Sequence, residues 1–369
     1  MTIYILYSAD YELFLGGNYC NETEVLIKPT NILLNLFDEL KIPITLFADI
    51  FSILRYKEQN SFYFPDRAEN QLKDAIRRGH DVQSHVHPHW NFTQIEENNY
   101  KFNLDYFLLG NLDNNTELLY SKIQNYLITS RIYLNNLLRQ VNNNYNCIAF
   151  RSGGYGLQPH SNIVIKALID SGFIIDSSIV PDFILKSNVN IIDFSIVPKI
   201  ANYYLDCNLY TPSAENKGIF EIPIASCKFN IIAHTFYQID MLVRLFQNKM
   251  LHGKLNNEKQ RGYGIQDTVI RSRHAKYYKF LKSLNNRFYY LDCSTNDEKM
   301  FQCTKKYLSQ FDCNNNDIFF SFNMHPKVMT KEHFKALENY HNKLKIYYQD
   351  SIQSISYQHA AEMLIKKSL

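Results

Sequence analysis

The sequence predicts an α/β fold with a mostly parallel sheet, either open or closed into a barrel. Short runs rich in Ile, Tyr and Phe alternate with longer stretches of helical period through much of the 369-residue chain. This repetition is typical of parallel sheets, because a crossover, usually a helix, must separate one parallel strand from the next. An apolar content of 46% with 20% charged residues is that of an ordinary globular protein, and the chain is long enough to bury a sizeable core.

The expected elements follow this alternation from the N-terminus. Leu33, Leu36 and Phe37 share one helical face, and Gly79 stands where a helix end favours glycine. The expected helices are residues 30–41, 66–78, 116–140 and 162–171. The expected strands are residues 3–8, 44–48, 80–85, 147–150, 173–177, 219–224, 288–293 and 318–323.

No repeat, low-complexity linker or hinge divides the chain. We therefore expect one catalytic domain over residues 1–369, with an insertion at about 91–142 that begins with a polar stretch and continues into a long helix. Residues 183–210 and 251–264 show no clear period and are interpreted as loops over the mouth of a site.

Charge and cysteine content argue against several classes of protein. A net charge of +3 without a Lys/Arg-rich run argues against a nucleic-acid partner. Residues 1–10 lack a basic region, and no window of about 18 residues is apolar throughout, so neither a secretory signal nor a membrane span is expected. The seven cysteines have no CxxC spacing and are interpreted as reduced thiols of a cytoplasmic protein, not as disulfides or a Cys-based zinc site.

Three histidines close together, His85, His87 and His89, are the strongest chemical signal. His85 and His89 can reach one point if the chain turns after the expected strand, and Pro88 favours such a turn. Imidazole nitrogens suit zinc, iron, cobalt or nickel. We therefore expect His85 and His89 to bind a divalent metal, with His87 facing away to pack or to form a hydrogen bond. The alternative is a surface cluster with incidental affinity for metal.

Two carboxylates, Asp10 and Glu12, follow the first expected strand. Ligands of parallel α/β folds collect at the carboxyl ends of the strands. Residues two apart point to the same side of a strand, so one carboxylate can bind a metal while the other accepts a proton from an attacking water. An isolated Asp-x-Glu is more often a solvated turn, so this interpretation depends on the neighbouring histidines.

Several segments resemble, in order, the motifs of the polysaccharide deacetylase family, the NodB-homology carbohydrate esterases. The most specific is G-H-D-x-x-x-H-x-x-x-H at residues 79–89, which is similar to the metal-binding motif of the family. The other similar segments are the acidic pair at 10–12, R-S-G-G-Y-G at 151–156, G-F-I-I-D-S-S at 172–178, E-I-P at 221–223 and M-H-P at 324–326. The fit is closer to the branch found in bacterial surface-polysaccharide gene clusters than to secreted chitin or peptidoglycan deacetylases.

The resemblance implies a fold and a reaction. It implies a distorted, incomplete (β/α) barrel of mostly parallel strands with outer helices and an inserted long helix. It also implies a hydrolase that cleaves a linear amide bond on a sugar with the help of a divalent metal, usually Zn²⁺.

The resemblance also implies catalytic roles for matching residues. Asp10 would be the catalytic base and Glu12 the third metal ligand, although the family motif, with adjacent aspartates, leaves this split reversible. Arg151 would keep Asp10 ionised, since a neighbouring cation lowers the pKa of a carboxylate. His325 would protonate the leaving amine, and Asp176 would orient it.

Further residues are implied to bind substrate. Backbone donors at Gly154 and Tyr155 would hold the oxyanion, and Trp90, which follows the histidines, would line the substrate groove. Gly154 stands where the family has proline, and the segment is one residue longer, so the position of these donors stays open.

We expect a cytoplasmic enzyme that removes an acetyl or formyl group from a sugar nitrogen during surface-polysaccharide (lipopolysaccharide) assembly, with the sugar possible in free or carrier-linked form. Arg271, Arg273 and His274 could meet a carrier phosphate, although a solvated helix face is the simpler interpretation. The alternatives are a metal-dependent hydrolase of a non-sugar amide and a catalytically silent carbohydrate-binding protein on the same fold. The oligomeric state stays open.

Overall fold

The computed structural model of the chain describes residues 2–96, 99–187, 189–239, 243, 260–264, 287–311 and 317–368. The basic cluster of Arg271, Arg273 and His274 lies outside the described residues, as does most of the expected loop at 251–264. Within the described ranges, none of the helices combines the length and apolar character that crossing a bilayer requires.

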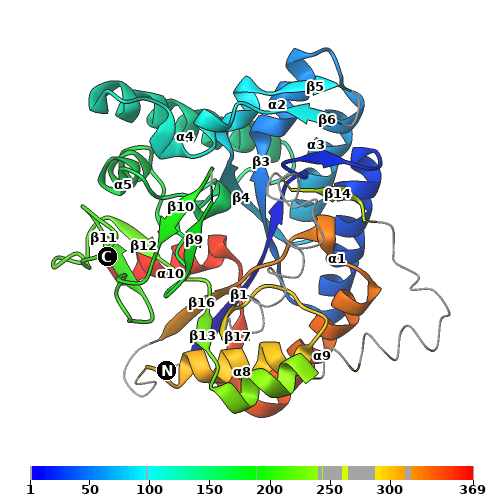
Figure 1. Cartoon of the computed structure of the whole chain (residues 1–369), viewed down its shortest axis with the longest axis vertical. Coiled ribbons are helices and arrows are strands. Elements are labelled where there is room, and N and C mark those ends of the chain that lie inside the picture. Colours follow the sequence, from blue (N-terminus) through cyan, green and yellow to red (C-terminus); the bar gives the residue numbers. More distant parts are fainter. Residues whose placement is uncertain are drawn as a thin grey trace.

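A mostly parallel sheet forms the centre of the fold (Figure 1). Strand β1 (Ile3–Tyr11) lies between β3 (Thr45–Asp49) and β16 (Ile318–Phe322) and runs parallel to both. From β3 the parallel sheet continues through β4 (Asp81–Val86), β7 (Ala149–Ser152), β8 (Ile175–Asp176) and β12 (Ile219–Glu221). The edge strands are β17 (Ile352–Ser354), parallel to the start of β1, and β11 (Tyr203–Leu205), antiparallel to β12.

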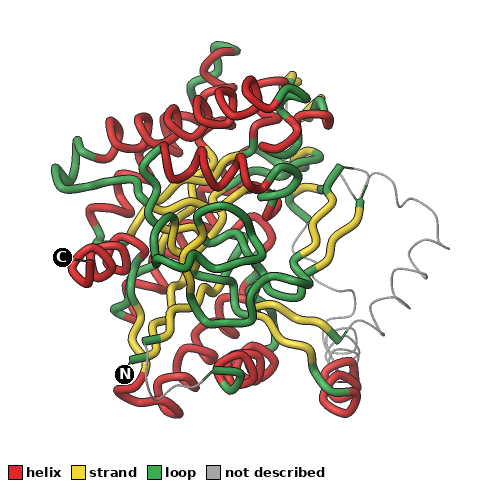
Figure 2. The backbone as a smooth tube through the Cα atoms, turned by 90° about the vertical axis from the view of Figure 1, so that its left-hand side faces the viewer, coloured by secondary structure: helices red, strands yellow, loops and turns green. Residues whose placement is uncertain are grey.

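Helices cover the outside of this sheet, as Figures 1 and 2 show. The four expected helices are present as α1 (Lys28–Leu40), α3 (Tyr63–Arg77), α4 (Thr116–Leu138) and α5 (Ser161–Asp170). Helices α8 (Asp297–Leu308), α9 (Lys331–Tyr348) and α10 (Tyr357–Ser368) lie between and after the last expected strands, and the structure adds α2 (Ile50–Glu58). Helix α2 follows β3 without a loop, because the Asp49 side chain accepts a hydrogen bond from the backbone N–H of Phe51 and so caps the helix.

Smaller antiparallel sheets account for the main differences from the expected elements. The expected strand at 288–293 does not join the parallel sheet as a whole: β15 (Phe288–Tyr290) pairs with β13 (Ser226–Lys228), and only Asp292 reaches the end of β16, where it bridges Asn323. The region expected as a loop at 183–210 contains β11 and the hairpin β9 (Ile184–Lys186) with β10 (Ile191–Asp193). The insertion begins with β5 (Gln94–Glu96) and β6 (Asn99–Lys101), which extend a sheet with β2 (Gly17–Asn18) and β14 (Gly262–Tyr263).

The sheet curls toward a barrel, and a few contacts bridge the gap between β12 and β16. Beyond β12, the N–H of Ser321 donates to the Pro223 carbonyl at 2.9 Å, and the N–H of Ala225 donates to the Ser321 carbonyl at 3.1 Å. Nearer the start of β16, the Asn202 side chain accepts from the N–H of Phe319 and donates to its carbonyl, both at 2.8 Å. A side-chain amide thus replaces part of a strand ladder. The expected distorted, incomplete (β/α) barrel is confirmed.

Helix α10 covers the amino-terminal end of this barrel. The N–H of Gln358 donates to Asp81 Oδ2 at 3.1 Å, at the start of β4. Tyr357 packs in one apolar cluster with Leu6 and Phe47, which come from β1 and β3. These side chains therefore face the barrel interior.

The period-two alternation of strands continues this interior row toward the carboxyl end. On β1, Ser8 follows Leu6 on the same side, and its Oγ lies 3.2 Å from the Oγ of Ser321 on β16. The next residue of the row is Asp10. The interior row thus changes from apolar to polar along the barrel, and its ionisable side chains lie at the carboxyl end.

Replacing the bridging amide in Asn202→Ala is expected to lower the free energy of unfolding by about 1–3 kcal/mol, because the backbone groups of Phe319 lose their partner. Chemical denaturation measures this difference. The control is Asn136→Ala on the exposed face of α4, which should change stability by less than about 0.5 kcal/mol. Equal stability of Asn202→Ala and the unchanged protein would contradict the bridging role.

Candidate metal centre and active site

Interior rows from four strands end in polar side chains at the carboxyl end of the barrel. The residues are Asp10 on β1 and Glu12 just after it, His85 on β4 and His87 just after it, Arg151 on β7, and Asn323 and His325 after β16. All are buried except His325, whose side chain is 19% exposed. Charges held this far from water must be balanced by one another or by a ligand.

Glu12, His85 and His87 offer three ligand atoms that lie within 4.8 Å of one another. Glu12 Oε2 is 2.6 Å from His87 Nε2 and 3.6 Å from His85 Nε2. The other ring nitrogen of His85, Nδ1, lies 2.9 Å from the Arg151 carbonyl, which accepts its proton. The lone pair of His85 is therefore on Nε2, the atom that faces Glu12, as a metal ligand requires.

The three facing atoms have no conventional hydrogen-bond partner although each is buried. One carboxylate oxygen and two imidazole nitrogens form a common ligand set for Zn²⁺ and similar cations. The residues present therefore fit a divalent cation.

Lys327 supplies a charge beside this cluster. Its ammonium donates to Glu12 Oε1 at 2.7 Å. Burial opposes the charge on Glu12, but Lys327 and then His87 outweigh it and hold its pKa well below the ordinary value. Burial also opposes a proton on His85, yet Asp10 and Glu12 outweigh it and raise the pKa of that imidazole. The cluster thus attracts positive charge.

The second histidine of this cluster is His87, and not His89 as expected. His85 and His87 are two apart on an extended chain and therefore face the same side. His89 lies past Pro88 in a short 3-10 turn, fully buried, with its ring stacked on Phe107 at a centroid distance of 5.1 Å. Burial and the neighbouring His87 lower the pKa of His89 well below its ordinary value. His89 is thus a packing residue.

Asp10 and Arg151 form the ion pair that the sequence suggested. Arg151 Nη1 donates to Asp10 Oδ1 at 2.8 Å, and both side chains are buried. Burial opposes ionisation of Asp10, but Arg151, and after it His85 and His325, hold its pKa far below the ordinary value. Asp10 is therefore a carboxylate at any physiological pH.

His325 lies between two carboxylates. Its Nε2 is 3.3 Å from Asp10 Oδ2, and its Nδ1 is 3.4 Å from Asp292 Oδ1. Burial would lower the pKa of His325, but Asp292 and Asp10 outweigh it and raise that pKa to about 10. The imidazole is therefore a cation at neutral pH.

Asp292, and not Asp176 as expected, is the residue beside His325. Asp176 accepts a hydrogen bond from the Ser178 hydroxyl at 2.7 Å, and β8 pairs it with Glu221 of β12. Burial raises the pKa of Asp176, although a hydrogen bond from Glu221 opposes this effect. Burial and the neighbouring Asp176 both raise the pKa of Glu221. The two carboxyls therefore tend to share a proton at a distance from the His325 imidazole.

The turn of Gly153, Gly154 and Tyr155 forms one wall of the cluster. A Cβ at Gly153 would lie 2.5 Å from His87 Nδ1, so only glycine lets the turn approach the imidazole. Gly154 and Tyr155 take left-handed φ angles of 59° and 61°. The Tyr155 hydroxyl accepts a hydrogen bond from Asn323 Nδ2 at 3.0 Å, which brings Tyr155 to the catalytic side chains.

Trp90 does not line an open groove, in contrast to the expectation. It is fully buried and packs edge-on against Tyr100 at a centroid distance of 5.0 Å and stacks with His89 at 5.6 Å. The short turn that follows β4 folds the indole into the insertion, where Tyr100 and Phe102 pack against it.

Asp49 is an additional acid at the end of β3, in register with His85. It is 1% exposed, and burial raises its pKa to about 6 against the opposing effect of His87 and His85. The period of β3 would have indicated Asp49, whereas Asp292, Asn323 and Lys327 depend on how distant segments meet.

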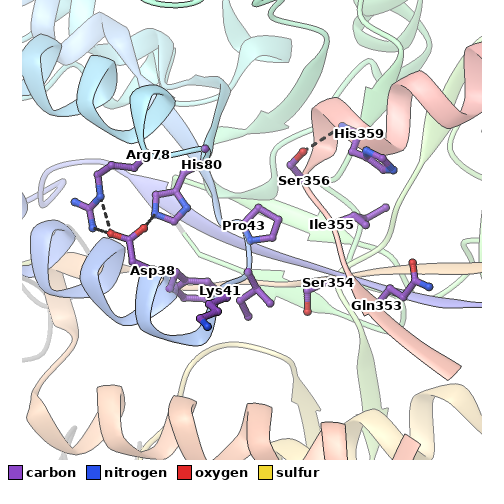
Figure 3. Close-up of a pocket in the computed structure, with 13 residues that line it drawn as sticks. Asp38, Lys41, Pro43, Arg78, His80, Gln353, Ser354, Ile355, Ser356 and His359 are labelled. Carbon is purple, nitrogen blue, oxygen red and sulfur yellow. Dashed lines mark hydrogen bonds and ion pairs between the residues drawn. The ribbon is translucent and has the colours of Figure 1, made fainter. Parts of the chain in front are cut away.

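A pocket lies at the opposite end of the barrel (Figure 3). It measures about 620 Å³, and its walls include Pro43, which precedes β3, and His80, which precedes β4. His80 Nε2 lies 3.2 Å from Asp38, which also binds Arg78. These contacts hold helix ends together at the amino-terminal side, away from the catalytic cluster.

No model of a known protein family and no curated protein sequence matches the chain. One similar solved structure is a protein from Mycobacterium smegmatis that is described as a polysaccharide deacetylase. The two chains are 12% identical, the match covers 100% of this chain and 92% of that chain, and the TM-score is 0.44. A polysaccharide deacetylase from Pseudomonas aeruginosa PAO1 shows 12% identity, coverage of 99% and 91%, and a TM-score of 0.46. Puue allantoinase shows 12% identity, coverage of 98% and 89%, and a TM-score of 0.45. Similarity at this level establishes neither a family nor an activity.

His87→Ala is expected to lower the affinity for Zn²⁺ by at least about tenfold, because it removes a ligand atom. His89→Phe should keep the affinity, since its ring would pack against the same aromatic neighbours. Elemental analysis of the purified variants and titration with a competing chelator give both values. Loss of metal in His89→Phe together with retention in His87→Ala would reverse the assignment.

Proposed function

We propose that the protein hydrolyses an N-acyl group, acetyl or formyl, from a sugar with the help of a divalent cation, most readily Zn²⁺. The single observation that carries this proposal is the convergence of Glu12, His85 and His87 beside a buried carboxylate, Asp10, and a cationic imidazole, His325. A ligand set, a base and an acid within one cluster are what amide hydrolysis requires.

Glu12 Oε2, His85 Nε2 and His87 Nε2 would hold the cation. When bound there, it supplies polarisation of the scissile carbonyl and makes an attacking water more acidic. The chain itself supplies buried, charged surroundings, in which each electrostatic contact is stronger than in water.

Asp10 would act as the general base. Arg151 and Asn323 hold its two oxygens at 2.8 Å and 3.3 Å, so the carboxylate cannot rotate away. The water would give its proton to Asp10 as its oxygen bonds to the acyl carbon. The oxyanion that forms there would be met by backbone N–H groups near Gly154 and Tyr155.

His325 would act as the general acid. Amide cleavage needs a proton on the leaving nitrogen, because an amide anion is a very poor leaving group. The His325 Nε2 proton, held as part of a cation by Asp292 and Asp10, would pass to that nitrogen as the C–N bond breaks. The products are a free amine on the sugar and a carboxylic acid.

The substrate is proposed to be an N-acylated sugar of surface-polysaccharide (lipopolysaccharide) assembly, free or carrier-linked, in the cytoplasm. Tyr155, Phe183 and Tyr290 form an aromatic group beside the cluster, with ring centroids 5.7 to 6.1 Å apart. Aromatic faces of this kind pack well against the apolar face of a sugar ring.

The test is amine release from a panel of N-acetyl and N-formyl amino sugars, with and without chelator. We expect chelation to abolish turnover, and His85→Ala and Asp10→Asn to lower kcat/KM by on the order of 10²-fold or more. Retained activity in His85→Ala would reject the mechanism. Turnover confined to non-sugar amides in the same panel would replace the substrate, and bound metal without any turnover would indicate a silent carbohydrate-binding protein.

The pH dependence of the reaction should report the state of His325. Asp292→Asn removes the charge that most strongly favours the imidazolium, so the pKa of His325 falls from about 10. Since His325 must carry its proton to act, the alkaline limb of kcat/KM should move to lower pH in this variant. Asp350→Asn, at an exposed position far along the chain, is the control and should leave the limb in place. An unmoved limb in Asp292→Asn would argue against His325 as the acid.

A further inference from the structure

Lys327 is a buried cation that contacts the proposed metal ligand directly. It lies in the short 3-10 turn Pro326–Val328 after β16 and is 9% exposed. Its ammonium donates to Glu12 Oε1 at 2.7 Å and to the carbonyl of Leu13 at 3.1 Å. A buried ammonium with two fixed acceptors is an unusual neighbour for a site that attracts another cation.

The two oxygens of Glu12 consequently have different partners. Oε1 faces Lys327, with His325 Nε2 at 3.9 Å on the same side. Oε2 faces the imidazoles of His87 and His85 at 2.6 Å and 3.6 Å. The Lys327 contact therefore fixes the rotation of the carboxylate and presents one oxygen to the proposed cation.

We propose that Lys327 is a positioning residue that restricts Glu12 to a single-oxygen contact with the cation, an inference that rests on the proposed function. Without Lys327, the carboxylate can turn and offer both oxygens. It would also have no fixed counter-ion other than the cation itself.

This restriction has a chemical consequence. A carboxylate that shares its charge with an ammonium gives less electron density to a bound cation, which then remains a stronger electrophile. The ammonium also repels the cation across the carboxylate, so it lowers affinity. Lys327 thus exchanges some metal affinity for polarising power.

The experiment compares the full chain with Lys327→Met, an apolar side chain of similar length. We expect the Zn²⁺ dissociation constant, measured by chelator competition, to fall on the order of tenfold in the variant, because a nearby like charge is removed. We also expect the visible absorption of the Co²⁺-loaded variant to weaken, because ligation by both oxygens of Glu12 raises the coordination number. At saturating metal, kcat should fall more than KM rises.

Lys343→Met is the matched control, since this lysine also contacts carboxylates at 2.7 Å, on Asp297 and Glu298, but belongs to the α8–α9 contact outside the site. It should leave Zn²⁺ affinity and the Co²⁺ spectrum unchanged. If Lys327→Met does not fold, Lys327→Gln, which keeps a donor but not the charge, decides the question by the same measurements.

Unchanged Zn²⁺ affinity and an unchanged Co²⁺ spectrum in the folded variant would overturn the role of Lys327 while leaving the proposed function intact. Weaker Zn²⁺ binding would also overturn it, because the ammonium would then support the ligand set without restricting it. An unaltered protein that binds no divalent cation would overturn both proposals together.

Discussion

The guanidinium of Arg151 is the interaction on which the arrangement of the site depends. It is fully buried inside the barrel, so each of its N–H groups needs an acceptor there. It donates to Asp10 on β1 and to Asn323 beyond β16, both at 2.8 Å. The backbone carbonyl of Arg151 accepts a hydrogen bond from His85 on β4. One residue of β7 therefore sets the rotation of the proposed base and the tautomer of an imidazole that is proposed to bind a metal.

The same guanidinium also connects the site with the other end of the barrel. Its Nη2 reaches the Ser321 hydroxyl at 2.9 Å and the Tyr357 hydroxyl of α10 at 3.3 Å. Phe47 packs its ring face 4.2 Å from the guanidinium carbon. The interior is thus apolar where α10 covers it and polar above Arg151, which separates the packing core from the reacting groups.

Regular alternation made much of this predictable. The parallel sheet followed from the strand–helix repeat, and the pairing of Asp10 with Glu12 followed from the period of two along β1. The same period, applied to β4, groups His85 with His87, whereas the expectation of His89 relied on a turn at Pro88 that would bring it back to His85.

The rest depended on contacts that no local pattern encodes. Asp292 reaches His325 only because the chain beyond β15 crosses to the end of β16, and the expected parallel strand at 288–293 gave no hint of that crossing. Asp176 belongs to a matching motif, yet the pairing of β8 with β12 places it beside Glu221. Trp90 adjoins the histidines in sequence, but the turn after β4 buries it.

The segment that follows β16 contacts several residues of the proposed site. Asn323 donates to Asp10 and to Tyr155, His325 lies between Asp10 and Asp292, and Lys327 binds Glu12. Asn323 and His325 continue the interior row of β16 past the point where its ladder ends, and Lys327 follows in the 3-10 turn Pro326–Val328. The proposed base, acid and metal ligand are consequently tied to one stretch of backbone, and a shift of this segment would change the contacts of all three together. In the proposed reaction, the geometry of proton transfer and the geometry of cation binding would therefore depend on the same segment.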